Sequence, residues 1–175
     1  MSLWISPEYQ ALQAELHARP QGYGGKGRKW APVVRELIAW YDARTVLDYG
    51  CGEGSLGSAL PGIAEYDPAM PGKDAPPAPA DLVVCTDVLE HIEPEKLPAV
   101  LIHLRFLTRT AALLVVALDA THKILADGRN AHLIQESPAW WETQVTAAGF
   151  RCEPLTIPIH LSPEKRAKRW IAVAR

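Results

Sequence analysis

Hydrophobic residues in this chain occur as short continuous runs and as stripes with helical spacing. Three runs, at residues 44–49, 80–86 and 110–118, predict buried β-strands. Two stripes predict amphipathic helices over residues 31–43 and from residue 94 to residue 107. Runs that alternate with stripes predict an α/β protein in which helices cover both faces of a mostly parallel sheet.

Capping residues predict two more helices. Ser6 and Pro7 are a suitable cap and first-turn residue for a helix near the N-terminus. Ser137 and Pro138 have the same order, and they predict a helix that ends at Gly149.

Shorter segments complete the predicted sheet. Residues 62–66 predict a second strand, and residues 151–159 and 169–173 predict a final antiparallel pair at the edge of the sheet. The proline-rich residues 74–79 predict neither a helix nor a central strand.

A glycine-rich turn follows the first predicted strand and organises the chain. Residues 45–54 read Thr-Val-Leu-Asp-Tyr-Gly-Cys-Gly-Glu-Gly, and a helix begins after them. Glycines let a ligand approach the backbone, and a helix N-terminus presents unpaired N–H groups. Asp48 would repel a pyrophosphate, and it suits a ligand that carries an ammonium group. Asp67 ends the second predicted strand 19 residues later, close to the usual spacing of an acidic ribose ligand; the alternative is a turn-forming Asp before Pro68.

Two stretches resemble the motifs of one enzyme family. VLDYGCGEG at residues 46–54 resembles the first motif of the class I S-adenosylmethionine-dependent methyltransferases, and DLVVCTDVLEHI at residues 81–92 is similar to their fourth-strand motif. The resemblance implies a Rossmann-like methyltransferase fold. Typical members place a further helix and strand after the second strand, and the short link from Asp67 to residue 80 implies that both are missing. We therefore expect a compact variant, shortened after the second strand.

The resemblance also implies a site for S-adenosylmethionine. The cofactor's amino-acid end is expected at the glycine turn, its ribose at the end of the second strand and its adenine after the third predicted strand. A glycine-rich, basic segment at residues 21–30 is expected to close over it as a lid; the alternatives are a linker or a contact with a nucleic-acid backbone. The candidate contacts are Tyr23, Lys29, Asp48, Tyr49, Gly50, Cys51, Gly52, Asp67, Pro68, Asp87, Val88 and Leu89.

The segment after the third predicted strand carries the candidate catalytic residues. On a helical turn Asp87, Glu90 and His91 share one face, and His132 lies downstream. Similar motifs hold a divalent ion in small-RNA 3′-end methyltransferases and are implied in ubiquinone-pathway relatives, so these four are candidate ligands of Mg²⁺ or Zn²⁺. The alternatives are metal-free acid–base catalysis by His91 or His132, with Glu90 beside them, and purely structural roles.

Composition and charge bear on the number of domains, the class of partner and the expected cellular location. The chain has 175 residues and a net charge of −2, which fits one domain and gives no basic excess of the kind that coats nucleic acid. Residues 1–43 are expected to supply the N-terminal helices and the lid, and residues 44–175 the methyltransferase core. Three cysteines without paired spacing and no signal peptide favour the cytoplasm, and no apolar run suggests a membrane span.

The acceptor of the methyl group is expected to be a small-molecule or sugar hydroxyl. The alternatives are RNA or DNA methylation and a non-catalytic subunit that supports a partner enzyme. The acceptor pocket is expected to form from the lid, residues 119–135 and a partner chain or second copy.

Overall fold

The structure is a computed structural model that describes residues 4–18, 25–158 and 161–175. One six-stranded sheet has the order β2-β1-β3-β4-β6-β5. Strands β2, β1, β3 and β4 are parallel neighbours, whereas β6 is antiparallel to both β4 and β5, so the predicted mixed sheet is confirmed. The strands are β1 (Val46–Tyr49), β2 (Ala64–Tyr66), β3 (Ala80–Thr86), β4 (Thr108–Ala117), β5 (Cys152–Pro154) and β6 (Arg169–Ala174).

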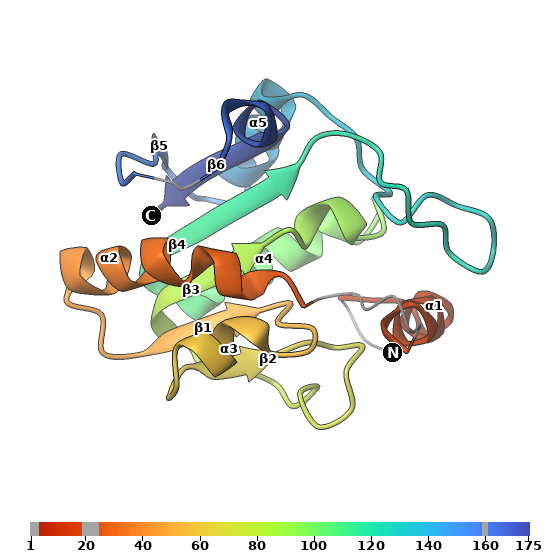
Figure 1. Ribbon diagram of the computed structural model, residues 1–175, viewed down its shortest axis with the longest axis horizontal. Coiled ribbons are helices and arrows are strands. Elements are labelled where there is room, and N and C mark those ends of the chain that lie inside the picture. Colours follow the sequence, from red (N-terminus) through yellow and green to blue (C-terminus); the bar gives the residue numbers. More distant parts are fainter. Residues whose placement is uncertain (1–3, 19–24, 159–160) are drawn as a thin grey trace.

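Helices cover both faces of this sheet (Figure 1). One core joins α2 and α3 to the side of β3 that carries Leu82 and Val84, and the other joins α4 and α5 to the side that carries Val83 and Cys85. Strands β3 and β4 are apolar on both sides, which is why the sequence shows them as continuous runs. The helices are α1 (Pro7–His17), α2 (Ala31–Tyr41), α3 (Ser55–Ala59), α4 (Leu97–Leu107), α5 (Pro138–Ala147) and α6 (Pro163–Ala167), with 3₁₀ turns η1 (Gly27–Trp30) and η2 (Leu89–His91).

Side-chain caps begin α1 and α5 where the sequence predicts them. The side chain of Ser6 accepts a hydrogen bond from the Tyr9 N–H, and the side chain of Ser137 accepts one from the Trp140 N–H. Such caps satisfy N–H groups that have no partner within the first helical turn. None of the helices in the described residues is long and apolar enough to serve as a membrane span.

The segment between β2 and β3 contains no helix or strand, as the proline-rich sequence predicts. It turns back on itself, because the Asp67 N–H donates to the Lys73 carbonyl at 2.9 Å. Strand β2 is consequently an edge strand of the sheet.

Helix α1 lies apart from the two main layers, beyond the carboxyl ends of the parallel strands (Figure 1). It packs in a small separate core with Ala69 from the segment after β2 and with Leu125 and Ala131 from the loop after β4. The N-terminal helix therefore bridges two loops that are far apart in the sequence.

Candidate active site

The glycine turn after β1 depends on left-handed backbone conformations. Gly50, Gly52 and Gly54 have φ angles of 77°, 51° and 79°. The N–H groups of Gly50 and Cys51 both donate to the Tyr66 carbonyl, at 2.7 and 3.1 Å, which ties the turn to the end of β2. A side chain other than hydrogen is strained at such φ values, so the backbone itself favours glycine at these three positions.

Gly50→Ala is expected to lower the free energy of unfolding more than Gly62→Ala. A Cβ at Gly50 would lie 2.5 Å from Cγ2 of Val88, whereas a Cβ at Gly62, also at positive φ, would meet nothing within 4 Å. Both variants carry the backbone strain of about 1–2 kcal/mol, and only Gly50→Ala adds the clash. Urea unfolding measures the difference; equal losses for the two variants would contradict this account of the turn.

Asp67 joins the end of β2 to the glycine turn. The residue is 7% exposed, and its two carboxylate oxygens accept hydrogen bonds from the Gly52 and Ala69 N–H groups, each at 2.9 Å. These bonds fix the carboxylate beside the turn, where it lines the main cavity of the protein.

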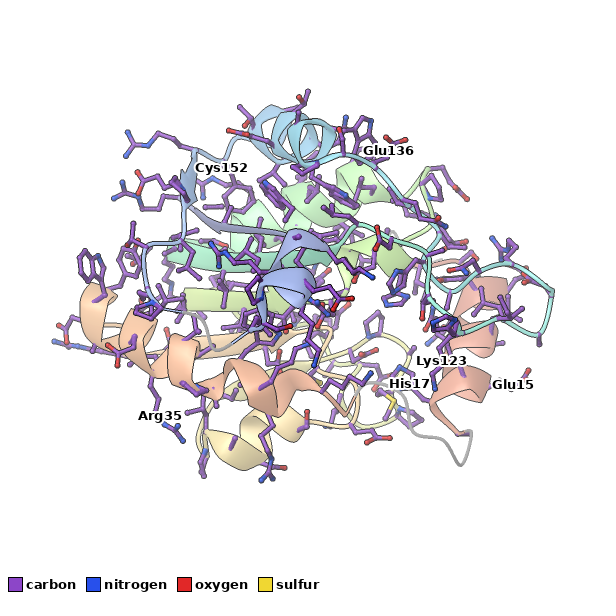
Figure 2. The ribbon with its side chains drawn as sticks, turned by 45° about the horizontal axis from the view of Figure 1, so that its top comes forward. Glu15, His17, Arg35, Lys123, Glu136 and Cys152 are labelled. Carbon is purple, nitrogen blue, oxygen red and sulfur yellow. The ribbon has the colours of Figure 1, made fainter. Side chains whose placement is uncertain are left out.

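A cavity of about 540 Å³ lies at the carboxyl ends of β1, β2 and β3, a size that suits a ligand of the nucleoside class. The cavity is lined by residues of α1, of the glycine turn, of the segment from the end of β3 through η2, and of the loop after β4. Figure 2 shows two labelled examples, His17 from α1 and Lys123 from the loop.

Glu90, His91 and His132 form a cluster at one side of this cavity. One ligand atom from each lies within 4.8 Å of the others, which is a spacing that a divalent cation can bridge. The Ile134 N–H donates to the Glu90 carbonyl at 3.0 Å, and this bond fixes the loop of His132 against η2. The cluster therefore depends on a contact between segments about 40 residues apart.

The comparisons with known proteins find likeness in structure alone. No protein-family model and no curated protein matches the sequence. A 1,6-didemethyltoxoflavin-N1-methyltransferase from Burkholderia thailandensis, solved with S-adenosylhomocysteine, superimposes with a TM-score of 0.64 and 18% identity over 98% of this chain and 90% of its own. The methyltransferase domain of bacterial CtHen1 superimposes with a TM-score of 0.59 and 15% identity over 84% of this chain and 97% of its own. This chain has the fold of the class I S-adenosylmethionine-dependent methyltransferases.

A third methyltransferase structure supports the same assignment. The magnesium protoporphyrin IX methyltransferase from Synechocystis PCC 6803, with bound S-adenosylhomocysteine, gives a TM-score of 0.54 and 18% identity over 96% of this chain and 94% of its own. The match covers nearly the full length of both chains. The methyltransferase fold therefore accounts for the whole described structure.

Most residues expected to contact the cofactor line the cavity of this methyltransferase fold. Asp48, Cys51 and Leu89 do not line it, and Tyr23 lies outside the described residues. The residues on the cavity wall are Lys29, Tyr49, Gly50, Gly52, Asp67, Pro68, Asp87 and Val88, together with the cluster residues Glu90, His91 and His132.

Asp48 is buried near the end of β1, two residues before the glycine turn. Burial, reinforced by the nearby Glu65 carboxylate, raises its pKa to about 7 although Lys73 opposes the shift. Lys73 is placed there by the segment after β2; its ammonium group lies 3.0 Å from Glu65 and donates to the Gly52 carbonyl at 3.3 Å. Asp48 does not line the cavity, and its contact with a ligand's ammonium group stays a prediction.

The cluster of Glu90, His91 and His132 has the features of a cation site. Oε1 of the fully buried Glu90 accepts from the Ala117 N–H at 3.0 Å, and Oε2 has no hydrogen-bond partner among the described residues. The Nδ1 atoms of His91 and His132 each donate to a backbone carbonyl at 2.6 Å, which makes Nε2 the acceptor atom of both rings. A buried carboxylate oxygen without a donor is costly unless a proton or a cation balances it.

Burial changes the protonation of this cluster in the protein without a cation. It raises the pKa of Glu90 to about 8, with Asp87 adding to the shift, and it lowers the pKa of His91 to about 3, with His132 adding to that shift. Burial also lowers the pKa of His132. Near neutral pH the two histidines are therefore uncharged, which is the form that binds a metal ion.

The structure separates Asp87 from this cluster. The helical period of the sequence predicts Asp87, Glu90 and His91 on one face, but Asp87 has a φ of 55°, and the 3₁₀ turn begins only at Leu89. The Asp87 carboxylate pairs with Lys29 at 2.5 Å and with Arg169 at 3.1 Å. Burial opposes ionisation of Asp87, but these two cations outweigh it and hold its pKa below the usual value. Asp87 is therefore not part of the group that could hold a cation.

Arg169 lines the cavity although it was not among the candidate site residues. It ends a basic C-terminal cluster whose pattern indicates a solvated face or the lead-in to a strand, and its neighbours Lys165, Arg166 and Lys168 are exposed. Arg169 is the first residue of β6, and its side chain is 19% exposed. The sequence places Arg169 at the start of a predicted strand, in which alternate side chains point to opposite faces of the sheet. This placement is the signal that separates Arg169 from its exposed neighbours.

Proposed function

We propose that this protein is an S-adenosylmethionine-dependent methyltransferase that transfers the methyl group to a hydroxyl of a small molecule or sugar. The observation that carries the proposal is the single cavity that joins the glycine turn, the Asp67 carboxylate and the Glu90–His91–His132 cluster. It provides adjoining places for a ribose, a sulfonium and a reacting oxygen. A non-catalytic subunit would have no need for that combination.

The residues of the cavity have separate roles in this reaction. The cofactor supplies an electrophilic methyl group on its sulfonium, and the turn and Asp67 orient it. Positioning of this kind accounts for a large part of the rate enhancement in a bimolecular displacement. Asp87 keeps Lys29 and Arg169 on the cavity wall, so the three charges form one fixed group beside the acceptor.

The acceptor hydroxyl loses a proton when the new bond to carbon forms, and the cluster is the place where that proton leaves. Glu90, His91 and His132 fit a divalent cation, and when bound it supplies a Lewis acid beside the acceptor. Without a cation, Nε2 of His132 is the better proton acceptor of the two rings, because burial depresses the pKa of His91 to about 3.

A nucleic-acid acceptor is the second candidate, and the charge around the cavity favours it. Lys26, Lys29, Lys123 and Arg169 line the cavity, and the exposed cations of α6 and its flank lie next to Arg169. Salt-sensitive binding of short RNA or DNA oligonucleotides distinguishes this candidate from a small-molecule acceptor.

Methyl labelling of metabolite and oligonucleotide pools tests the proposal. Purified protein and labelled S-adenosylmethionine are incubated with each pool, with and without EDTA. We expect label in a hydroxyl-bearing product and loss of transfer in EDTA. Calorimetry with S-adenosylhomocysteine is the control, because cofactor binding should persist in EDTA; no binding of S-adenosylhomocysteine would overturn the proposed function.

A further inference from the structure

We propose that the N-terminal segment from Trp4 to Tyr9 forms the wall that holds the purine ring of the cofactor, in the place where this fold lacks a strand. The inference rests on the proposed function, because it assumes that S-adenosylmethionine binds in the main cavity. It assigns a binding role to α1 that neither the sequence motifs nor the comparisons indicate.

The shortened segment after β2 leaves one side of the cavity without secondary structure. Asp67 ends β2, and the chain then makes the tight turn closed by the Lys73 carbonyl before it crosses to β3. From this segment only Asp67, Pro68 and Ala69 line the cavity. A base attached to a ribose at Asp67 would therefore be open to solvent unless another element covers it.

Helix α1 is fixed over this side by three hydrogen-bonded contacts. The N–H and the hydroxyl of Ser6 donate to the two carboxylate oxygens of Glu93 at 2.8 and 2.6 Å. The hydroxyl of Tyr9 donates to the His91 carbonyl at 2.5 Å, and the amide of Gln10 donates to the Pro68 carbonyl at 2.6 Å. The helix thus spans from the end of β2 to the turn after β3, the two segments between which the base would lie.

The N-terminal end of α1 and the residues before it contribute Trp4, Ile5 and Tyr9 to the cavity lining, whereas Gln13 and His17 line it further along the helix. Further apolar lining comes from the segments after β2 and β3 and from α4, namely Ala69, Val88, Ile92 and Val100. The Lys and Arg residues that line the cavity come from η1 and the residue before it, from the loop after β4 and from β6, so the apolar lining suits a flat uncharged ring.

An aromatic stack holds Trp4 in place. Its indole lies on the His103 ring of α4, with centroids 4.0 Å apart and planes 6° from parallel. Nδ1 of His103 lies 3.1 Å from the hydroxyl of Tyr49, at the end of β1, and Trp4 and Tyr49 both line the cavity. Trp4 is therefore a rigid aromatic wall, a side-chain type that binds a base through stacking and apolar contact.

The test compares two ligands that differ only in the base. S-adenosylhomocysteine carries adenine, and S-ribosylhomocysteine keeps the ribose and the amino acid but lacks it. In calorimetry Trp4→Ala is expected to weaken S-adenosylhomocysteine binding about tenfold or more, the loss typical of one stacked base, and to leave S-ribosylhomocysteine binding unchanged. Trp40→Ala is the matched control, because Trp40 is 72% exposed on α2 and away from the cavity.

The outcomes separate this inference from the proposed function. Equal affinity of Trp4→Ala and the unaltered protein for S-adenosylhomocysteine would overturn the purine wall and leave the methyltransferase proposal standing. A loss of affinity for both ligands to the same degree would also overturn it. If the unaltered protein binds neither ligand, the proposed function itself fails.

A second measurement avoids the need for a stable Trp4→Ala protein. The intact chain is labelled with 5-fluorotryptophan, and Trp4→Phe assigns the fluorine resonance of Trp4 among the six tryptophans. S-adenosylhomocysteine is expected to shift this resonance, and S-ribosylhomocysteine is expected to leave it in place. A Trp4 resonance that does not respond to saturating S-adenosylhomocysteine would overturn the inference.

Discussion

Glu90→Gln is expected to abolish divalent-cation binding and methyl transfer while the protein remains folded. Glutamine keeps the shape of the side chain and the acceptor for the Ala117 N–H, but it removes the negative charge that a cation requires. Burial already favours the neutral carboxyl, since it raises the pKa of Glu90 to about 8, so the neutral amide should be tolerated in the core. We expect at least a 100-fold loss of Mn²⁺ or Zn²⁺ affinity in calorimetry, since even changes around a metal's ligands remove about 10–100-fold.

Glu136→Gln is the matched control for this prediction. Glu136 is exposed just before α5 and does not line the cavity (Figure 2). The two variants should have similar melting temperatures, and only Glu90→Gln should lose cation binding and activity. Cation affinity that is unchanged in Glu90→Gln would remove the cluster as a metal site and leave His132 as the candidate base.

Asp67→Asn is expected to weaken S-adenosylhomocysteine binding by about 30–100-fold, the second large effect. Hydrogen bonds to a charged acceptor contribute about 1.5–3 kcal/mol each, and the amide provides one acceptor oxygen in place of two. The carboxylate already accepts from the Gly52 and Ala69 N–H groups, which hold it facing the cavity. Binding is measured by calorimetry, and the melting temperature shows whether the turn remains intact.

Asp74→Asn controls for the loss of one charge in the same segment. Asp74 is exposed and lies outside the lining of the main cavity. The affinity of the Asp74→Asn variant for S-adenosylhomocysteine should equal that of the unaltered protein. If the affinity of Asp67→Asn for S-adenosylhomocysteine is also within twofold of that of the unaltered protein, the ribose is held elsewhere. The ribose-binding role that the family resemblance implies for Asp67 is then wrong.

The order of elements follows from local signals in the chain. Serine caps begin α1 and α5, and prolines keep the segment after β2 free of helix and strand. The continuous apolar runs of β3 and β4 indicate strands buried on both faces, because such strands have no polar side to display. These features depend on residues that are neighbours in sequence, which is why the sequence suffices to predict them.

The predicted helical face of Asp87, Glu90 and His91 is a feature that the neighbouring residues in the sequence do not determine. A helical period places all three side chains together, but Asp87 adopts a left-handed conformation and pairs with Lys29 and Arg169. Those partners come from η1 and β6, on either side of Asp87 in the sequence. The helical period of residues 87–91 does not indicate these ion pairs, because they form only after the sheet has assembled.

By itself the sequence determined the strand–turn–helix corner, the acidic residue at the end of β2 and the loss of the element that normally follows. Only the tertiary structure decided which of these residues face one cavity. It left Asp48 off the cavity wall and brought Arg169, Trp4 and Tyr9 onto it. The physical reason is that strands, helix caps and turns follow from residues close together in the sequence, whereas a site is made by contacts between segments that the folded sheet brings together.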